Sequence, residues 1–85
     1  MDMRVKILYF AALREALGVS VEDFDLPAGV ASVAALRECL VARGGAWQRL
    51  AAANVKTAVN QRMAGGEAAV GQGDEVAFFP PVTGG

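Results

Sequence analysis

The chain has 85 residues, a length typical of one small domain with a modest hydrophobic core. Its formal net charge is −1 and its basic residues are scattered, which argues against nucleic acid as a partner. No apolar run approaches the roughly 20 residues of a transmembrane helix, and the N-terminal segment lacks the pattern of a cleavable signal. Since one cysteine cannot form an internal disulfide, we expect a soluble cytoplasmic domain.

Residues 3–10 (MRVKILYF) have the alternation of a β-strand with two unlike faces. One face is apolar throughout: Val5, Ile7 and Tyr9. The other begins with charges and ends with apolar groups: Arg4, Lys6, Leu8 and Phe10. A short helix is predicted over 11–17 and ends at Gly18, because glycine accepts the left-handed conformation after a helix. A second strand is predicted over 19–26, with these side chains facing inward: Val19, Val21 and Phe24.

The longest helix is predicted over 32–43, where Ser32 caps the first amides. An apolar stripe at helical spacing is expected to face the core: Val33, Leu36, Cys39 and Leu40. The thiol of Cys39 should therefore be buried and inert. The charged positions of the same helix are expected to face water: Arg37, Glu38 and Arg43.

The second half of the chain predicts short elements. We expect a short helix or single turn at 46–53, two short strands at 56–60 and 62–64 around Asn60-Gln61, a turn at 71–74 and a final strand at 75–79. The final strand stops at Pro80-Pro81, which lack donors for a sheet. This order favours an α+β fold, a mixed sheet with the 32–43 helix across one face.

Side chains for catalysis are scarce in this sequence. There is no histidine, and Cys39 has none of the partners that a metal site needs, so we expect no metal. No base accompanies the hydroxyl groups, and we interpret Glu22, Asp23 and Asp25 as a solvated strand edge. The glycine pairs fit no phosphate-binding motif. A self-sufficient enzyme is therefore not expected.

The segment 80–85 (PPVTGG) has the composition of a slim tail with a stiff base. The prolines favour an extended chain that leaves the sheet, and Gly84-Gly85 would fit a channel too narrow for any side chain. The terminal carboxylate becomes reactive only after activation by another protein, for instance as an acyl-adenylate. The alternative is a frayed end.

Residues 73–85 (GDEVAFFPPVTGG) resemble the ending of the small subunit of molybdopterin synthase, the MoaD-like sulfur carriers. Residues 5–18 (VKILYFAALREALG) are similar to the opening of that family, and 57–61 (TAVNQ) to its middle. Residues 44–56 and 62–72 match no motif of the family. The resemblance implies a β-grasp (ubiquitin-like) domain over 1–79 with an extended Gly-Gly tail over 80–85.

The resemblance also implies a function. Gly85 would be adenylated by an E1-like adenylyltransferase that uses ATP, and would then carry sulfur as a thiocarboxylate (1-thioglycine). The tail would insert into the large subunit of a 2:2 heterotetramer and donate sulfur to a cyclic pyranopterin precursor, forming the dithiolene of molybdopterin. No cofactor would be bound here, and the catalytic side chains would belong to the large subunit. The inserting residues would be Pro80, Pro81, Val82, Thr83 and Gly84.

A β-grasp fold places the first and last strands side by side at the centre of the sheet. Val76 and Phe78 should then join the apolar face of 3–10 beneath the long helix. The opposite face would group Leu8, Phe10 and Phe79 beside Ala77, and our hypothesis is that they dock the large subunit. The alternative is that loops cover them as ordinary core. For Arg14 we expect a solvated helix face rather than a partner contact.

Two other functions remain open. Related β-grasp proteins donate sulfur to thiamin or to tRNA. A binding-only β-grasp module, with an idle tail, is a different class of function.

Overall fold

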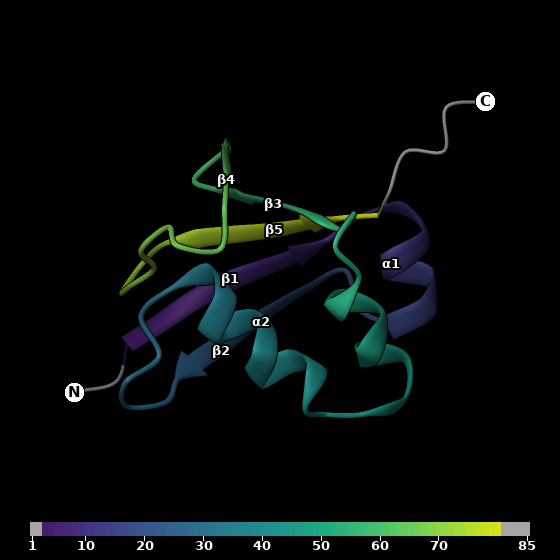
Figure 1. The fold of residues 1–85 in the computed structure, drawn as a ribbon, viewed down its shortest axis with the longest axis horizontal. Helices are drawn as coiled ribbons and strands as arrows, with labels where there is room; N and C mark the ends of the chain where they lie inside the picture. Colours follow the sequence, from purple (N-terminus) through teal and green to yellow (C-terminus); the bar gives the residue numbers. More distant parts are fainter. Residues whose placement is uncertain (1–2, 81–85) are drawn as a thin grey trace.

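The computed structural model describes residues 3–80, which form a five-stranded sheet with helices packed against it (Figure 1). The elements, in chain order, are β1 (Met3–Tyr9), α1 (Ala11–Leu17), β2 (Val21–Leu26), α2 (Val33–Val41), the 3₁₀ helix η1 (Gly45–Ala51), β3 (Lys56–Val59), β4 (Arg62–Ala64) and β5 (Glu75–Phe79). Every predicted element is present, with bounds shifted by a few residues. In the described part of the chain, no helix combines the length and apolar character needed to cross a bilayer.

The strand order of the sheet is β2-β1-β5-β3-β4. The central strands β1 and β5 are parallel, with Ile7 opposite Val76 and Tyr9 opposite Phe78, whereas the other neighbours are antiparallel. The mixed sheet and the central position of the first and last strands are therefore confirmed. This is the β-grasp fold.

The hydrophobic core lies between α2 and one face of the sheet, which we call the inner face. The predicted apolar positions of β1 and β5 are all buried there. They pack with Val33, Leu36 and Leu40 of α2, and Leu50 of η1 joins the same cluster. The side-chain oxygen of Ser32 accepts a hydrogen bond from the Ala35 amide at 3.2 Å, so the predicted cap of α2 is confirmed.

In strand β2, the side chain of Val21 lies on the opposite face of the sheet from the one predicted. Val21 lies opposite Leu8 on the outer face, away from α2, and is 48% exposed, so its predicted inward position is wrong. Val19 and Phe24 pack partly buried against the core, as predicted. The facing of an edge strand follows its register with the neighbouring strand, because residues directly opposite share a face. Glu22 lies opposite Ile7 and consequently faces inward.

A two-residue turn at Asn60-Gln61 connects β3 and β4. Both residues have positive φ, 50° and 69°, which is the conformation of a type I′ hairpin turn. The Asn60 side chain accepts a hydrogen bond from the Glu75 amide at 2.9 Å and donates one to Asp74 at 3.0 Å. These bonds attach the hairpin to the beginning of β5.

Candidate docking face and tail base

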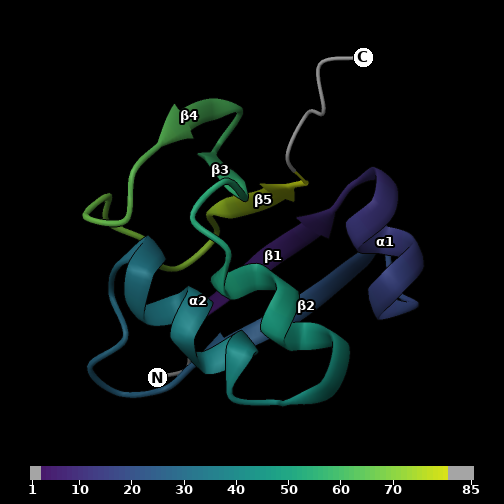
Figure 2. The same ribbon diagram turned by 45° about the vertical axis from the view of Figure 1, so that its right-hand side comes forward.

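The outer face of the sheet carries an apolar row that crosses all five strands. Both helices and η1 lie away from this face in the two ribbon views (Figures 1 and 2). The strand pairings place the members of the row directly opposite one another: Val21, Leu8, Ala77, Ala58 and Met63. The ends of the row are open to solvent, with Met63 68% and Val21 48% exposed. The two alanines are buried between their larger neighbours.

Phe10 and Phe79 form a stacked pair beside this row. Their ring centroids are 4.9 Å apart with an interplanar angle of 6°, and Phe10 is 39% exposed. The structure thus brings Leu8, Phe10 and Phe79 to one face next to Pro80, as predicted. We call the apolar row together with this aromatic pair the docking face. Sequence reasoning missed Val21 and Met63, although the alternation of the 62–64 strand would have placed Met63 on the opposite face from Arg62 and Ala64.

The far half of the outer face is polar. Lys6 lies between Asp23 and Glu75 on the neighbouring strands, and Arg4 forms an exposed ion pair with Asp25 at 2.9 Å. Charged groups therefore occupy the end of β1 at which the strand begins. Apolar groups prevail at the end beside Pro80, where the exposed Lys56 lies opposite Phe79. This gradient makes the tail base the favoured side for an apolar partner.

Pro80 is the last residue that the structure describes. It follows β5 directly and is partly buried. The remaining residues assigned to the tail lie outside the described residues: Pro81, Val82, Thr83, Gly84 and Gly85. Their proposed roles stay predictions.

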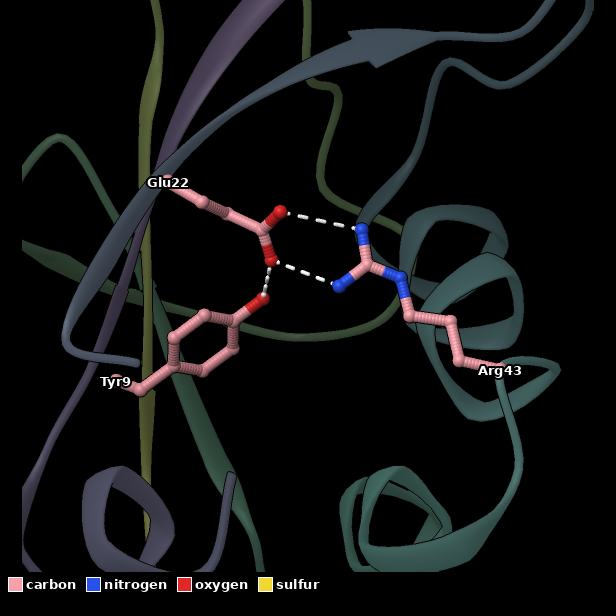
Figure 3. A network of polar contacts seen from close by, with 3 residues as sticks. All are labelled: Tyr9, Glu22 and Arg43. Atoms are coloured by element: carbon pink, nitrogen blue, oxygen red, sulfur yellow. Dashed lines mark hydrogen bonds and ion pairs between the residues drawn. The ribbon is translucent and has the colours of Figure 1, made fainter. Parts of the chain in front are cut away.

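A polar network on the inner side corrects the prediction for Glu22 (Figure 3). The Tyr9 hydroxyl donates a hydrogen bond to the Glu22 carboxylate at 2.7 Å, and the Arg43 guanidinium donates two at 2.9 and 3.1 Å. The Arg43 guanidinium also lies 4.3 Å from the Trp47 ring centroid. Glu22 is therefore not a solvated edge residue. Arg43 is exposed, as predicted, and its guanidinium also pairs with Glu22. The network joins β1 and β2 to the segment after α2.

Burial and hydrogen bonding oppose each other at Glu22. Desolvation raises the pKa of the Glu22 carboxyl, but the hydrogen bonds from Arg43 and Tyr9 and the charge of Arg43 outweigh it, so this pKa lies below its ordinary value. Burial, together with the bond to Glu22, raises the pKa of the Tyr9 hydroxyl. Tyr9 thus stays protonated and Glu22 ionised at neutral pH, which suits a structural clamp rather than a proton-transfer pair.

Arg37 forms a second clamp where an exposed side chain was predicted. Its Nη2 donates hydrogen bonds to the Val55 carbonyl at 2.9 Å and to the Thr57 hydroxyl at 3.0 Å. Burial lowers the pKa of the guanidinium. The prediction that Arg37 faces water is therefore wrong, because this long side chain reaches across from α2 to the chain that enters β3.

The described residues offer surfaces for binding more than groups for catalysis. Cys39 is partly exposed rather than buried, which corrects the prediction for this thiol. Within residues 3–80, no three His, Cys, Asp or Glu side chains gather as potential metal ligands. Arg14 lies on an exposed surface of α1, as expected.

Comparison with known families assigns this chain to one of them. The ThiS family matches residues 7–85, which include both aromatic residues of the docking face and the whole tail. The chain belongs to the ThiS family.

Relatives within and around the ThiS family agree with the resemblance. A molybdopterin synthase sulfur carrier subunit from Haemophilus influenzae is 42% identical over 82 residues, covering 95% of this chain and 99% of the relative. The crystal structure of SAMP1 from Haloferax volcanii superposes with a TM-score of 0.80 at 28% identity, covering 96% of this chain and 99% of SAMP1. These matches confirm the likeness to molybdopterin synthase small subunits and the β-grasp fold.

One solved relative is part of an assembly. A chain in the complex of subunits 1 and 2 of molybdopterin-converting factor from Helicobacter pylori matches with a TM-score of 0.64 and 25% identity. The match covers 98% of this chain and 100% of that one.

Proposed function

We propose that this protein is the sulfur-carrier subunit of a molybdopterin synthase. The observation that carries the proposal is the 42% identity to a named sulfur-carrier subunit over 95% of the chain. The placement of an exposed apolar face at the root of the FFPPVTGG segment supports it.

The chemistry belongs to the terminal carboxylate of Gly85. This carboxylate attacks the α-phosphate of ATP on an E1-like adenylyltransferase, and pyrophosphate leaves. Sulfur at the oxidation level of sulfide then displaces AMP from the acyl carbon, so that a C–S bond replaces a C–O bond and a thiocarboxylate results. Glycine is the least hindered acyl group for both steps. The body of the protein supplies recognition and needs no cofactor of its own.

The thiocarboxylate then serves the large subunit. The tail, Pro80 to Gly85, inserts into that subunit and delivers sulfur to a cyclic pyranopterin precursor. Two such transfers produce the dithiolene. The Helicobacter pylori complex supports a large-subunit partner, and we propose a heterotetramer of two small and two large subunits.

The docking face is proposed to hold the large subunit while the tail reaches its active site. An apolar partner surface would cover Phe10, Phe79, Leu8 and the exposed thioether of Met63. Replacing Phe79 by alanine should weaken binding by about 30-fold or more, the effect of losing a central aromatic contact worth roughly 2 kcal/mol. Met63→Ser should weaken it less, because Met63 lies at the rim. Calorimetry with the purified large subunit measures both, and unchanged affinity in Phe79→Ala would reject this face.

Intact-mass spectrometry tests the carrier chemistry most directly. Protein from cells that contain the activating enzyme should show one oxygen replaced by sulfur at Gly85. Deleting Gly85 should abolish sulfur transfer to the pterin precursor and leave the unfolding transition unchanged, because the hydrophobic core is formed by residues between Val5 and Phe78. A persistent plain carboxylate in the presence of the enzyme would favour a binding-only module instead. Sulfur loading without activity on the precursor would favour a carrier for thiamin or tRNA.

A further inference from the structure

A cavity of about 430 Å³ lies on the other side of the tail base from the docking face. Leu13 of α1, Ala52 and Val55 form apolar parts of its lining, and Pro80 forms its edge. Hydrogen bonds from the Ala52 amide to the Arg49 carbonyl, at 3.3 Å, and from the Val55 amide to the Ala52 carbonyl, at 3.1 Å, shape one wall. The cavity is thus built on backbone turns and buried side chains rather than on a loose loop.

The lining has the chemistry of a specific anchor site. Leu13 and Val55 belong to the hydrophobic core, so core side chains form part of the cavity wall. Arg49 is the single ionisable residue of the lining, and no carboxylate among residues 3–80 pairs with it. An apolar side chain with an acidic neighbour would fill the hollow and neutralise the guanidinium.

The position of the cavity ties it to the tail. Figures 1 and 2 both show the end of β5 beside α1. Pro80 lines the cavity, while its neighbour Phe79 stacks on Phe10 in the docking face. The docking face and the cavity therefore flank the first residue of the tail. A partner that contacts Pro80 can therefore reach both.

We propose that this cavity is a second docking site for the large synthase subunit. It receives one apolar side chain of that subunit, and an acidic side chain beside it pairs with Arg49. This inference rests on the proposed function and adds a second anchor, so that the tail base is held from two sides. A grip on both sides fixes the direction in which the tail enters the partner, which a single flat face does not.

Filling the cavity tests this proposal. In Ala52→Phe, at an exposed position with extended backbone (φ −64°, ψ 134°), the new ring would occupy the hollow without a change of fold. We expect about tenfold or greater loss of affinity for the large subunit, measured by calorimetry with the full-length chain. The matched control is Ala53→Phe, because Ala53 is also exposed but does not line this cavity, and its affinity should equal wild type. Thermal unfolding confirms that both variants are folded.

The charge is tested separately. Arg49→Gln should weaken binding several-fold, and Arg49→Lys should restore most of it, because the lysine keeps the positive charge. Equal affinity of wild type, Ala52→Phe and Arg49→Gln overturns the cavity proposal and leaves the proposed function intact. Absence of binding by the wild type overturns both.

The last residues of this chain, Val82 and the Gly85 carboxylate, have the same apolar and acidic chemistry as the expected partner. Nuclear Overhauser contacts in the isolated protein distinguish the two occupants. If the cavity serves the large subunit, the Val82 methyl groups show no contacts with the side chains of Leu13 and Val55. Such contacts would mean that the chain occupies its own cavity, which contradicts the proposal.

Discussion

On the inner face of the two central strands, Ile7, Val76 and Phe78 are fully buried, whereas on the outer face Leu8, Phe10 and Phe79 keep part of their surface in solvent. The same strands supply both sets, apart from Phe10, which directly follows β1, because successive side chains of a strand point to opposite faces. The inner set buries its apolar area within the chain. The outer set leaves apolar area for another molecule. With the docking proposed above, folding and docking would depend on alternate residues, and mutations should separate them.

The polar groups on the two sides of the sheet differ in their burial and in the number of their hydrogen bonds. The inner side holds the Tyr9–Glu22–Arg43 network, whose members are mutually satisfied. The outer face holds the Arg4–Asp25 pair, in which both side chains are more than half exposed. A partly buried ion pair with several hydrogen bonds should contribute more to stability than an open one.

The largest expected contrast is between neighbouring phenylalanines. Phe78→Ala should lower the free energy of unfolding by about 3–5 kcal/mol, because it leaves a cavity in the core. Phe79→Ala should lower it by about 1 kcal/mol or less, as for a partly exposed side chain, while it weakens binding to the large subunit. Urea denaturation of both variants measures the difference. Similar losses of stability would contradict the division of labour between the two faces.

The next contrast compares the two ion pairs. Glu22→Gln should cost about 1–2 kcal/mol at neutral pH, and Asp25→Asn less than about 0.5 kcal/mol because its pair is exposed. The pKa of Glu22 is lower in the folded state than its ordinary value of 4.5. The stabilisation is therefore complete above that ordinary value and disappears as the pH falls through the lower folded-state pKa.

Denaturation of wild type and Glu22→Gln at neutral pH and at about pH 3 measures this effect through the proton linkage. The two proteins should converge in acid. A gap of constant size would show that the charge of Glu22 is not what stabilises the network.

The smallest expected effect is a gain. Gln61 has φ of 69°, a conformation that costs a residue with a side chain about 1 kcal/mol and glycine little, so Gln61→Gly should stabilise the protein by about 0.5–1 kcal/mol. Ala53→Gly, at a residue without positive φ, should destabilise it instead. Thermal unfolding compares the two. Since Gln61 belongs to neither face, affinity for the large subunit should not change; a large change would extend the docking face into this turn.

The fold could be predicted because its signals are local. The alternation of 3–10, the cap at Ser32 and the stripe of the long helix each depend on a few neighbouring residues, and the structure confirms them. The tail motif supplied the family. In the docking face, Leu8, Phe10 and Phe79 followed from strand alternation together with the central pairing of β1 and β5.

The errors concern contacts between distant segments. Val21 was assigned inward because it alternates with Val19, but the register with β1 decides its face. Arg37 and Arg43 reach partners 20 and 21 residues away, which helical spacing cannot reveal. The cavity at Pro80 is lined by residues of α1 and of the segment after η1. Residues 44–56 match no family motif from which it could have been predicted.

The central place of β5 in the sheet has a consequence for partner binding, because the outer aromatic pair depends on the folded sheet. β5 lies between β1 and β3, so the β2–β1 and β3–β4 halves pair only through it. Phe10 and Phe79 come together only when β5 has inserted. A partner that contacts both rings, as proposed for the docking face, would consequently bind the folded chain and not an unfolded copy with the same terminal glycine.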